Sequence, residues 1–531
     1  MGCLASKPKK KHYLSDNFVI ERHKNVEDDY ILLKKIGQGS IGVIYMAESK
    51  RPNYCMDEDV SMHSHRGAKN KKKNSHHSRS PSCTTPKQNY AIKQIDTDMI
   101  DKRALESLKT EIKLLKTLDH PFIIKFFGSY STVVSPGGRE NLSVVMELCT
   151  GGALDKYVPY EEGTALILVA NIVEAVLYLH SHNIIHRDLK NENVMFADKD
   201  RDPNNIRLLD FGLAKIFSRS QPIRDRAGTI YSMSPEALRG EYNAQADMWS
   251  VGVLTYHLLS GKRPFWGETK SEIAQKVTTG RYSMVGPEWE KKSKEAKSFV
   301  RECLQFEPLL RYSPVEALKS PWLRKHTEFN IKNLSKNELG VLKMVQDSNS
   351  PRQEMEKLAL YAIAHKARSQ DMAKLRKLFL GIAKNDKREI TLLEMERALA
   401  GQFSTEQIRE WFARADIDES GSINFTEFVA SSFDAQSKLS SQDIIDAFRV
   451  FDRDDSGFIT ASNLREALQI DDGEYIDKLI HEADVAGDGK ISCREFRNFL
   501  MKNQLRTPVE EGCGPKSGYC SFENDPSMCC G

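Results

Sequence analysis

Residues 186–193 read His-Arg-Asp-Leu-Lys-Asn-Glu-Asn and combine side chains that chemistry on a phosphate requires. Asp188 can accept a proton from a hydroxyl, Lys190 can neutralise a phosphate, and Asn193 offers an oxygen to a divalent cation. Asp210, which opens a later Asp-Phe-Gly, offers a second oxygen ligand. The set predicts phosphoryl transfer, in which the catalytic residues are Asp188, Lys190 and Asn193 and the Mg²⁺ ligands are Asn193 and Asp210.

A glycine-rich turn and a strand lysine precede this loop. Gly37, Gly39 and Gly42 lie between two apolar runs, where backbone N–H groups can close over a triphosphate. Lys93 ends an apolar Tyr-Ala-Ile-Lys and can hold the α- and β-phosphates. Glu111 lies in a stretch with helical apolar spacing. We expect Glu111 to pair with Lys93.

These motifs, in this order, resemble the protein kinase superfamily, and the similarity runs from about residue 30 to residue 322. The resemblance implies a bilobal fold, ATP and Mg²⁺ as cofactors, and Ser or Thr hydroxyls of protein substrates as acceptors. It places adenine against the segment 144–149. The implied nucleotide-binding residues are Ile36, Gly37, Gly39, Gly42, Ile44, Ala91, Lys93, Glu111, Met146, Glu147, Cys149, Met195 and Asp210.

The same resemblance gives four further expectations. Asp225 takes the place of a phosphorylated activation-loop residue beside Arg187, which predicts activity without phosphorylation there. Glu236 should pair with Arg311, and the helix that begins near Asp247 should support the catalytic loop. Glu192 can attract a basic residue upstream of the target hydroxyl. However, Ala153 stands where many kinases that prefer basic substrates carry a glutamate.

A second motif repeats in the last third of the chain. The loop 416–427 has oxygen-bearing side chains at alternate positions, glycine at position six and glutamate at position twelve, which is the spacing that wraps oxygen ligands around Ca²⁺. Further loops start 36 and then 32 residues later, but one ends in Asn463 and the other has Ala486 at position three. The candidate ligands are Asp416, Asp418, Ser420, Ser422 and Glu427, then Asp452, Asp454 and Ser456, then Asp484, Asp488, Lys490 and Glu495.

An earlier unit at 383–394 completes four repeats. It keeps Glu394 at position twelve, but Ala383, Lys387 and Arg388 occupy positions that need oxygen or glycine. We expect this loop to be metal-free. The calcium stoichiometry stays open between one and three.

The segment between the two motif sets has helical spacing at 334–345 and 352–367. In the second stretch an apolar stripe lies near basic residues, which is typical of a target for a calcium-loaded EF-hand groove. The alternative is an ordinary linker helix packed on the next domain. The stripe consists of Met355, Leu358, Ala359, Ala362 and Ile363.

Kinase motifs, an amphipathic junction and four EF-hand units in this order resemble the calcium-dependent protein kinases. The implied fold is multidomain α+β, with a bilobal kinase fold followed by an all-α calmodulin-like EF-hand module. In that family the junction blocks the kinase at rest, and calcium makes the EF-hand module grip the junction. We expect a terminal segment at 1–29, a kinase domain at 30–323 with a disordered insertion at 49–88, an autoinhibitory junction at 324–370, EF-hand units at 371–502 and a cysteine-containing tail at 503–531.

The N-terminal sequence predicts membrane attachment. Gly2 fits the myristoylation pattern, Cys3 offers a palmitoylation site, and four lysines between positions 7 and 11 form a polybasic patch. These signals favour the cytoplasmic face of a membrane, the plasma membrane first, with a cytosolic pool. The alternative is a disordered, solvated tail.

Composition also limits the classes of protein to which this chain can belong. The net charge is only +3, so we expect no nucleic-acid partner. Ten cysteines without a C-x-x-C pair predict neither a disulfide framework nor a zinc site. The sequence has no run of eighteen apolar residues, so we expect no membrane-spanning helix. We also expect a monomer. Two alternatives remain, a calcium-sensing membrane adaptor whose kinase fold is a scaffold, and a constitutive kinase whose EF-hands are structural.

Overall fold

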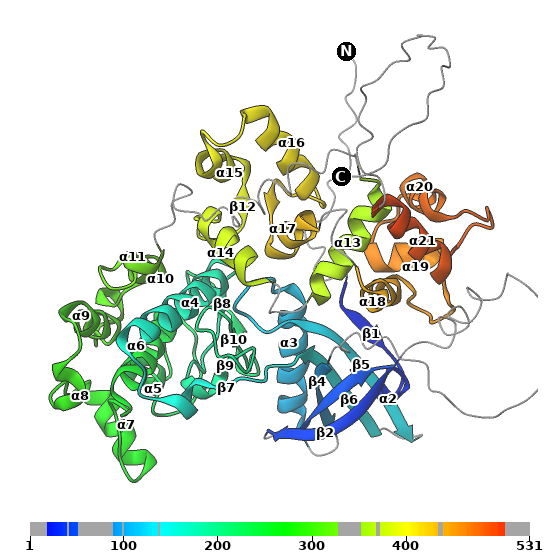
Figure 1. The fold of residues 1–531 in the computed structure, drawn as a ribbon. Helices are drawn as coiled ribbons and strands as arrows, with labels where there is room; N and C mark the ends of the chain where they lie inside the picture. Colours follow the sequence, from blue (N-terminus) through cyan, green and yellow to red (C-terminus); the bar gives the residue numbers. More distant parts are fainter. Residues whose placement is uncertain are drawn as a thin grey trace, which may run out of the picture.

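The computed structural model describes residues 18–39, 42–50, 89–97, 100–135, 139–327, 352–367, 372–433 and 439–504. They form a two-lobed kinase fold with a helical EF-hand region along one side (Figure 1). Positions 2 and 3, most of the insertion, the expected helix at 334–345 and the cysteine-containing tail lie outside the described residues.

The small lobe is built on a six-stranded sheet with the order β1-β5-β6-β4-β3-β2. All neighbours are antiparallel except β1, which pairs in parallel with β5. Helix α3 (Lys102–Thr117) buries Leu108, Glu111 and Ile112. The glycine turn joins β2 to β3, as the alternating sequence predicts. The other elements are β1 (Ile20–Arg22), α2 (Val26–Asp29), β2 (Tyr30–Gln38), β3 (Val43–Ser49), β4 (Asn89–Asp96), β5 (Phe126–Ser135) and β6 (Arg139–Glu147).

The large lobe surrounds two buried helices, α4 (Glu162–Ser181) and α6 (Gln245–Ser260). By length and composition α4 can cross a membrane, but 78% of its apolar window is buried in the protein, as expected of a core helix. The other helices are α5 (Pro235–Arg239), α7 (Lys270–Thr279), α8 (Pro287–Glu290), α9 (Lys294–Cys303), α10 (Pro314–Lys319) and α11 (Arg324–Thr327). Short strands support the catalytic loop, namely β7 (Gly152–Ala153), β8 (Ile184–Ile185), β9 (Val194–Phe196), β10 (Ile206–Leu208) and β11 (Lys215–Ile216).

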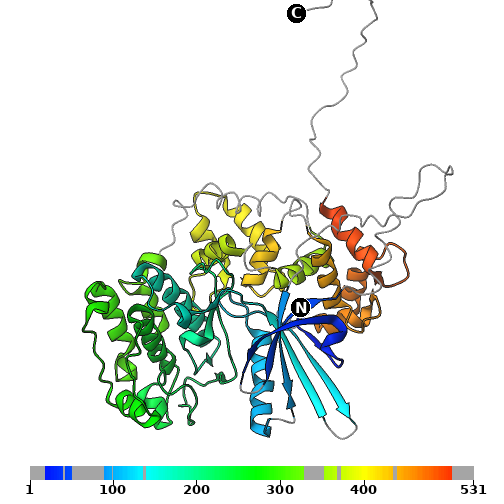
Figure 2. The ribbon, with the colours of Figure 1, turned by 60° about the horizontal axis from the view of Figure 1, so that its bottom comes forward.

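The EF-hand region consists of paired helix–loop–helix units. Strand β12 (Ile390–Thr391) pairs with β13 (Ser422–Ile423), and β14 (Phe458–Ile459) pairs with β15 (Ile491–Ser492). Each loop therefore has a partner, as the regular repeat predicts. Figure 2 shows the first pair beside the large lobe and the second beside the small-lobe sheet. The helices are α14 (Ala373–Ile382), α15 (Leu392–Leu399), α16 (Thr405–Ala415), α17 (Phe425–Ser432), α18 (Ser441–Phe451), α19 (Ala461–Leu468), α20 (Gly473–Ala483) and α21 (Cys493–Gln504).

The junction helix α13 (Glu354–Lys366) is enclosed more completely than one apolar stripe predicts. It packs against α17, α18 and α20. Leu360 and Tyr361 are buried together with the expected stripe, and so are the polar residues His365 and Lys366. The sequence could not show this, because the additional contacts come from the kinase and from a distant N-terminal segment.

That N-terminal segment joins both parts of the molecule. Phe18 is buried within 4.8 Å of the Tyr361 ring and 5.6 Å of the Phe451 ring, measured between centroids. Strand β1 then adds Ile20 and its neighbours to the kinase sheet. The folded chain therefore includes residues 18–29, which the sequence assigns to a terminal segment. Three apolar residues in a row are too short a signal to predict a strand.

A buried ion pair fixes the activation segment to the large lobe, as the sequence predicts. Arg311 is fully buried and its Nη1 lies 2.7 Å from Oε1 of Glu236. Replacing Glu236 with Gln leaves a buried cation without its counter-charge, so we expect about 3 kcal/mol less stability of the kinase domain. Thermal unfolding followed by circular dichroism measures the change.

The control is Arg224→Ala, which removes a pair between two exposed side chains, Arg224 and Glu241. It should cost no more than about 0.5 kcal/mol. Equal destabilisation by both variants would contradict a special role for the buried pair.

Candidate active site and calcium sites

A buried carboxylate holds the catalytic loop in place. Both oxygens of Asp247 accept backbone N–H groups, from His186 at 2.9 Å and from Arg187 at 2.9 Å. His180 Nε2 lies 2.9 Å from the same carboxylate. Burial raises the pKa of Asp247, but the hydrogen bonds from His180 and the backbone outweigh it and lower the pKa below its usual value. Helix α6 thus positions the loop, in line with the sequence-based expectation.

The loop brings Asp188 into a cluster of hydrogen-bond donors. Lys190 Nζ lies 2.6 Å from Oδ2 of Asp188, and the Thr229 hydroxyl donates to Oδ1 at 2.6 Å. Asn193 donates its Nδ2 to Asp188 at 3.1 Å. Burial raises the pKa of Asp188, yet the bonds from Lys190 and Thr229 bring it below the usual value. Asp188 is therefore an ionised acceptor, the form that a hydroxyl substrate requires.

Lys93 and Glu111 face one another as the sequence predicts. Their charged atoms are 3.8 Å apart, an ion pair without a hydrogen bond. Burial raises the pKa of Glu111, an effect that Lys93 opposes and Asp210 reinforces. Phe211 is buried 4.9 Å from the ring of His186, whereas Asp210 is exposed. Asp210 therefore points away from the core and is open to a ligand.

The donor set fits a hard cation and a phosphate chain. Asn193 uses its amide nitrogen on Asp188, which leaves the amide oxygen for Mg²⁺, and Asp210 supplies a carboxylate. A Cβ on Gly42 would lie 2.4 Å from the carbonyl oxygen of Gln94, so this turn requires a glycine. Ala91 on β4 pairs with Met146 on β6, as expected of neighbours that line the adenine side.

Two side chains in the segment expected to bind adenine, those of Glu147 and Cys149, interact with the rest of the protein. Arg207 Nε binds the Glu147 carboxylate at 2.7 Å, so this side chain holds β10 and is not free for a base. Burial, and next the charge of Glu147, raise the pKa of the Cys149 thiol. The thiol is therefore neutral. Cys149, Cys303 and Cys493 are free cysteines among the described residues.

In the activation segment, the acidic residue Asp225 is bound by several donors. Arg187 Nη1 lies 2.8 Å from each oxygen of Asp225. Lys215 Nζ reaches the same carboxylate at 3.1 Å, and the Tyr242 hydroxyl at 2.8 Å. Asp225 therefore makes the contacts for which the sequence suggested it as a replacement for a phosphate.

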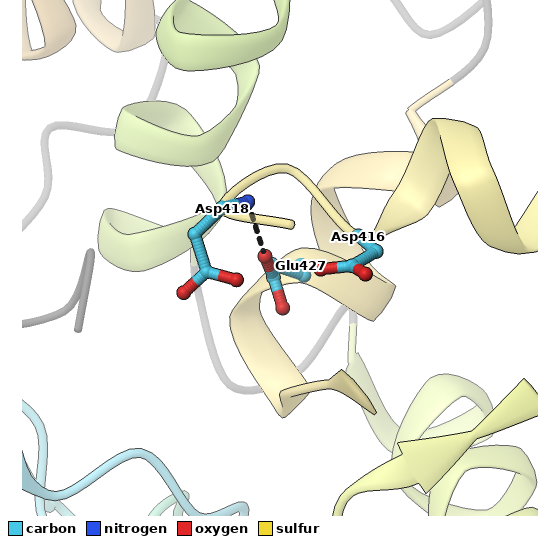
Figure 3. A group of neighbouring side chains, drawn as sticks. All are labelled: Asp416, Asp418 and Glu427. Atoms are coloured by element: carbon cyan, nitrogen blue, oxygen red, sulfur yellow. Dashed lines mark hydrogen bonds between the residues drawn. The ribbon is translucent and has the colours of Figure 1, made fainter. Parts of the chain in front are cut away.

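The loop 416–427 gathers three carboxylates (Figure 3). One oxygen each of Asp416, Asp418 and Glu427 lies within 4.8 Å of the others, and Glu427 is fully buried. Burial, followed by the charges of Asp418 and Asp416, raises the pKa of Glu427 well above its usual value. The mutual repulsion of these carboxylates favours a cation between them, and oxygen donors at this spacing suit Ca²⁺. Ser420 belongs to the same loop and donates its N–H to Asp416 at 2.9 Å.

The next two loops differ from the loop 416–427 at the positions that the sequence indicates, and weaker calcium binding there stays a prediction. In the loop 452–463 the Asn463 side chain accepts the N–H of Thr460 at 3.1 Å and brings no charge. In the loop 484–495 Glu495 accepts the N–H of Ala486 at 2.9 Å, while Asp484 accepts the N–H groups of Gly487 at 2.7 Å and Gly489 at 2.8 Å. Among the described residues, only the loop 416–427 forms a cluster of three carboxylates able to hold a metal.

The first loop carries a cation of its own. Arg388 Nη1 donates to the carbonyl oxygens of Ala383 at 3.2 Å and Asn385 at 3.3 Å, and its Nε binds Glu174 of α4. The guanidinium thus donates hydrogen bonds to carbonyl groups of the loop and connects the loop to the large lobe. No sequence signal indicated this contact, because Glu174 lies on a core helix.

Comparisons with known proteins match this arrangement. A model of the protein kinase domain matches residues 81–323, and models of an EF-hand domain pair match residues 387–435 and 441–501. Calcium-dependent protein kinase 3 of Plasmodium berghei is 34% identical over 422 residues, which are 76% of this chain and 74% of the relative. Calcium-dependent protein kinase 19 of rice (Oryza sativa subsp. japonica) is 31% identical over 432 residues, 79% of each chain. This chain belongs to the calcium-dependent protein kinase family.

It is accordingly a calcium-dependent serine/threonine protein kinase. A third relative, calcium-dependent protein kinase 34 of Arabidopsis thaliana, is 28% identical over 491 residues, 90% of this chain and 85% of the relative. The similarity therefore spans both the kinase domain and the EF-hand region.

In this calcium-dependent protein kinase the junction also contacts the kinase domain directly. His365 Nε2 lies 3.2 Å from the carbonyl oxygen of Phe126, and Lys125 Nζ reaches the carbonyl of Ala364 at 3.2 Å. Burial, and next the charge of Lys125, lower the pKa of His365 to about 3, so its ring is neutral. The C-terminal end of α13 therefore lies between β5 and the EF-hand region. Sequence reasoning missed Lys125, which follows an unremarkable apolar run.

The N-terminal strand contacts the second calcium loop. Arg22 donates to the backbone carbonyl of Asp452 at 3.2 Å, and both Arg22 and Lys24 form ion pairs with Asp455. From the other side, Arg449 reaches the carbonyl of Lys50 at 2.6 Å. The end of α18 and the first residues of the loop 452–463, all before β14, are thus attached to the small lobe.

Replacing Glu427 with Gln should weaken calcium binding at the loop 416–427 by roughly one to two orders of magnitude, because the loop loses its closing charge. Isothermal calorimetry on the full chain measures the number and affinity of the sites.

The control is Glu394→Gln at the same position of the first loop, whose carbonyl groups are held by Arg388. It should leave the calcium titration unchanged. A parent-like titration for Glu427→Gln would mean that this loop is not the principal site, and would favour a structural role for the EF-hands.

Proposed function

We propose that calcium bound to the loop 416–427 keeps the junction helix α13 in the EF-hand groove and so keeps the kinase cleft open to protein substrates. One observation carries this proposal, namely that a calcium loop, the junction and the kinase meet at one point. Thr426, the neighbour of Glu427, donates its hydroxyl and its N–H to the two oxygens of Asp119, each at 2.9 Å. Asp119 precedes β5 in the kinase domain.

The junction residue Tyr361 lies at the same point. Its ring is fully buried, and burial raises the pKa of its hydroxyl well above the usual value, with further contributions from Asp119, Glu427 and Asp418. A cation at the loop would compensate the two loop carboxylates beside this hydroxyl. Calcium then favours the arrangement in which α13 is enclosed, and tethering makes that capture intramolecular.

The catalytic residues have distinct tasks in the proposed reaction. Bound ATP with Mg²⁺ supplies the phosphate to be transferred. Asp188 accepts the hydrogen bond of the substrate hydroxyl and orients it. Lys190, within 2.6 Å of Asp188, carries the positive charge needed beside the transferring group. Lys93 is held by Glu111 toward the phosphates, while Asn193 and Asp210 offer oxygen ligands to the metal.

Replacing Asp188 with Asn should reduce phosphate transfer to a Ser/Thr peptide by roughly 10²- to 10⁴-fold, because the hydroxyl loses its negatively charged, basic acceptor. Nucleotide affinity should stay close to that of the parent, since Asp188 does not face the purine. Radiolabelled transfer and fluorescent-nucleotide titration measure the two effects. Parent-like transfer would remove Asp188 from this role, and loss of both properties would indicate a folding defect.

Replacing Leu358 with Asp should abolish stimulation by calcium, because a carboxylate cannot be buried at a position that is 3% exposed. The measurement is peptide phosphorylation at chelated and at micromolar calcium. Lys357→Ala, which removes only a partly exposed pair with Glu354, is the control and should respond like the parent. Normal stimulation of Leu358→Asp would contradict capture of α13 as the switch.

We further propose attachment to the cytoplasmic face of the plasma membrane through myristoylated Gly2 and palmitoylated Cys3. The supporting features are the acylation pattern and the adjacent lysines. In a eukaryotic expression system, Gly2→Ala should shift the protein from the membrane to the soluble fraction. Cys3→Ser should leave weaker, reversible attachment, because one acyl chain binds only marginally. Fractionation identical to the parent for both variants would contradict the proposal.

A further inference from the structure

The carboxylate of Glu192 is already bound within the protein. It lies in the catalytic loop between Lys190 and Asn193. Arg263 Nη2 reaches Glu192 Oε1 at 2.9 Å, and the hydroxyl of Tyr231 donates to the same oxygen at 2.6 Å. The sequence assigned Glu192 to a basic residue of the substrate. In the structure a basic residue of the enzyme takes that place.

Arg263 is held by more than this ion pair. Its guanidinium carbon lies 3.8 Å from the centroid of the Tyr231 ring and 5.8 Å from that of Trp266. A guanidinium stacked on a ring and paired with a carboxylate loses little entropy in forming the pair. Its side chain is 27% exposed, so it stays accessible from the groove. The arginine is therefore a fixed part of this surface.

The Arg263 site lies beside the phosphoacceptor position. Tyr231 follows Thr229, which binds Asp188 directly. The charge of Asp188 also raises the pKa of Tyr231, after burial and Glu192. An extended peptide advances about 3.3 Å per residue, so a peptide whose target hydroxyl lies at Asp188 reaches the neighbouring contact between Tyr231 and Arg263 within a few residues. A substrate residue therefore passes Arg263.

The neighbouring charges do not restore an acidic surface. Ala153 is buried and carries no charge. One oxygen of Asp155 is buried without a hydrogen-bond partner. Glu288 is paired with Lys262 at 2.8 Å. Beside the target hydroxyl, Lys190 and Arg263 supply positive charge, and Arg263 neutralises the charge of Glu192.

We propose that Arg263 is a specificity-determining residue that directs this kinase to Ser or Thr residues with an acidic neighbour and disfavours a basic one. Arg263 neutralises Glu192 and presents the unpaired edge of its guanidinium to the peptide. A carboxylate at the passing position gains a charge-assisted contact, and an arginine there meets a like charge. The inference rests on the proposed kinase activity and specifies its substrate class.

The test uses the full chain with ATP, Mg²⁺ and saturating calcium. A Ser peptide panel carries Asp, Ala or Arg in turn at each position from four residues before to two after the target, and kcat/KM is measured for each. We expect the parent to prefer Asp over Arg at one position by about tenfold, the effect of one charge-assisted hydrogen bond. Arg263→Ala should reverse the preference at that same position, because Glu192 becomes available.

Two more variants make the outcome decisive. Glu192→Gln frees Arg263 and should strengthen the preference for Asp, the opposite of Arg263→Ala. Lys270→Ala removes an exposed cation at the start of α7 and should leave the profile unchanged. A parent preference for Arg, or equal profiles for the parent, Arg263→Ala and Glu192→Gln, would overturn the proposal. Transfer to no peptide by the parent would instead contradict the kinase activity itself.

Discussion

The need to compensate buried carboxylates organises this molecule. Asp247 is fully buried, and the backbone N–H groups that satisfy it are those of the catalytic loop. The loop cannot move without leaving an ion unpaired in the core, which costs several kcal/mol. Glu427 presents the complementary case. Its charge is only partly satisfied by protein donors, so the loop 416–427 depends on an external cation.

At two other places the protein supplies the cation itself. Arg388 binds carbonyl groups of the first EF-hand loop and pairs with Glu174, so this repeat serves as an attachment to α4. Arg263 binds Glu192 and so changes which substrate charge the groove accepts. In both cases a guanidinium provides the positive charge that an external partner, a calcium ion or a basic substrate residue, would provide. The first EF-hand loop and the Glu192 site therefore keep their geometry, although a side chain of the protein replaces the external partner.

The sequence predicts the parts whose residues interact through short, ordered motifs. The catalytic loop, the Lys93–Glu111 pair, the Glu236–Arg311 pair and the paired loops lie where their spacing places them. The motifs require these side chains to adopt one arrangement, so little depends on distant context. The site roles of the nucleotide-binding residues remain predictions, although the strands that carry them are in place.

Contacts between distant segments could not be predicted in the same way. Phe18, Lys125 and Asp119 have no local pattern that marks them, and their roles arise only when the EF-hand region lies against β5. The same contacts explain why α13 is buried on every face from Leu358 to Lys366 and not on one stripe. A helix that must leave one partner for another would expose a large apolar surface in between. Enclosure by the EF-hands, the small lobe and the N-terminal strand together makes such an intermediate unfavourable, so capture of the junction is expected to be cooperative.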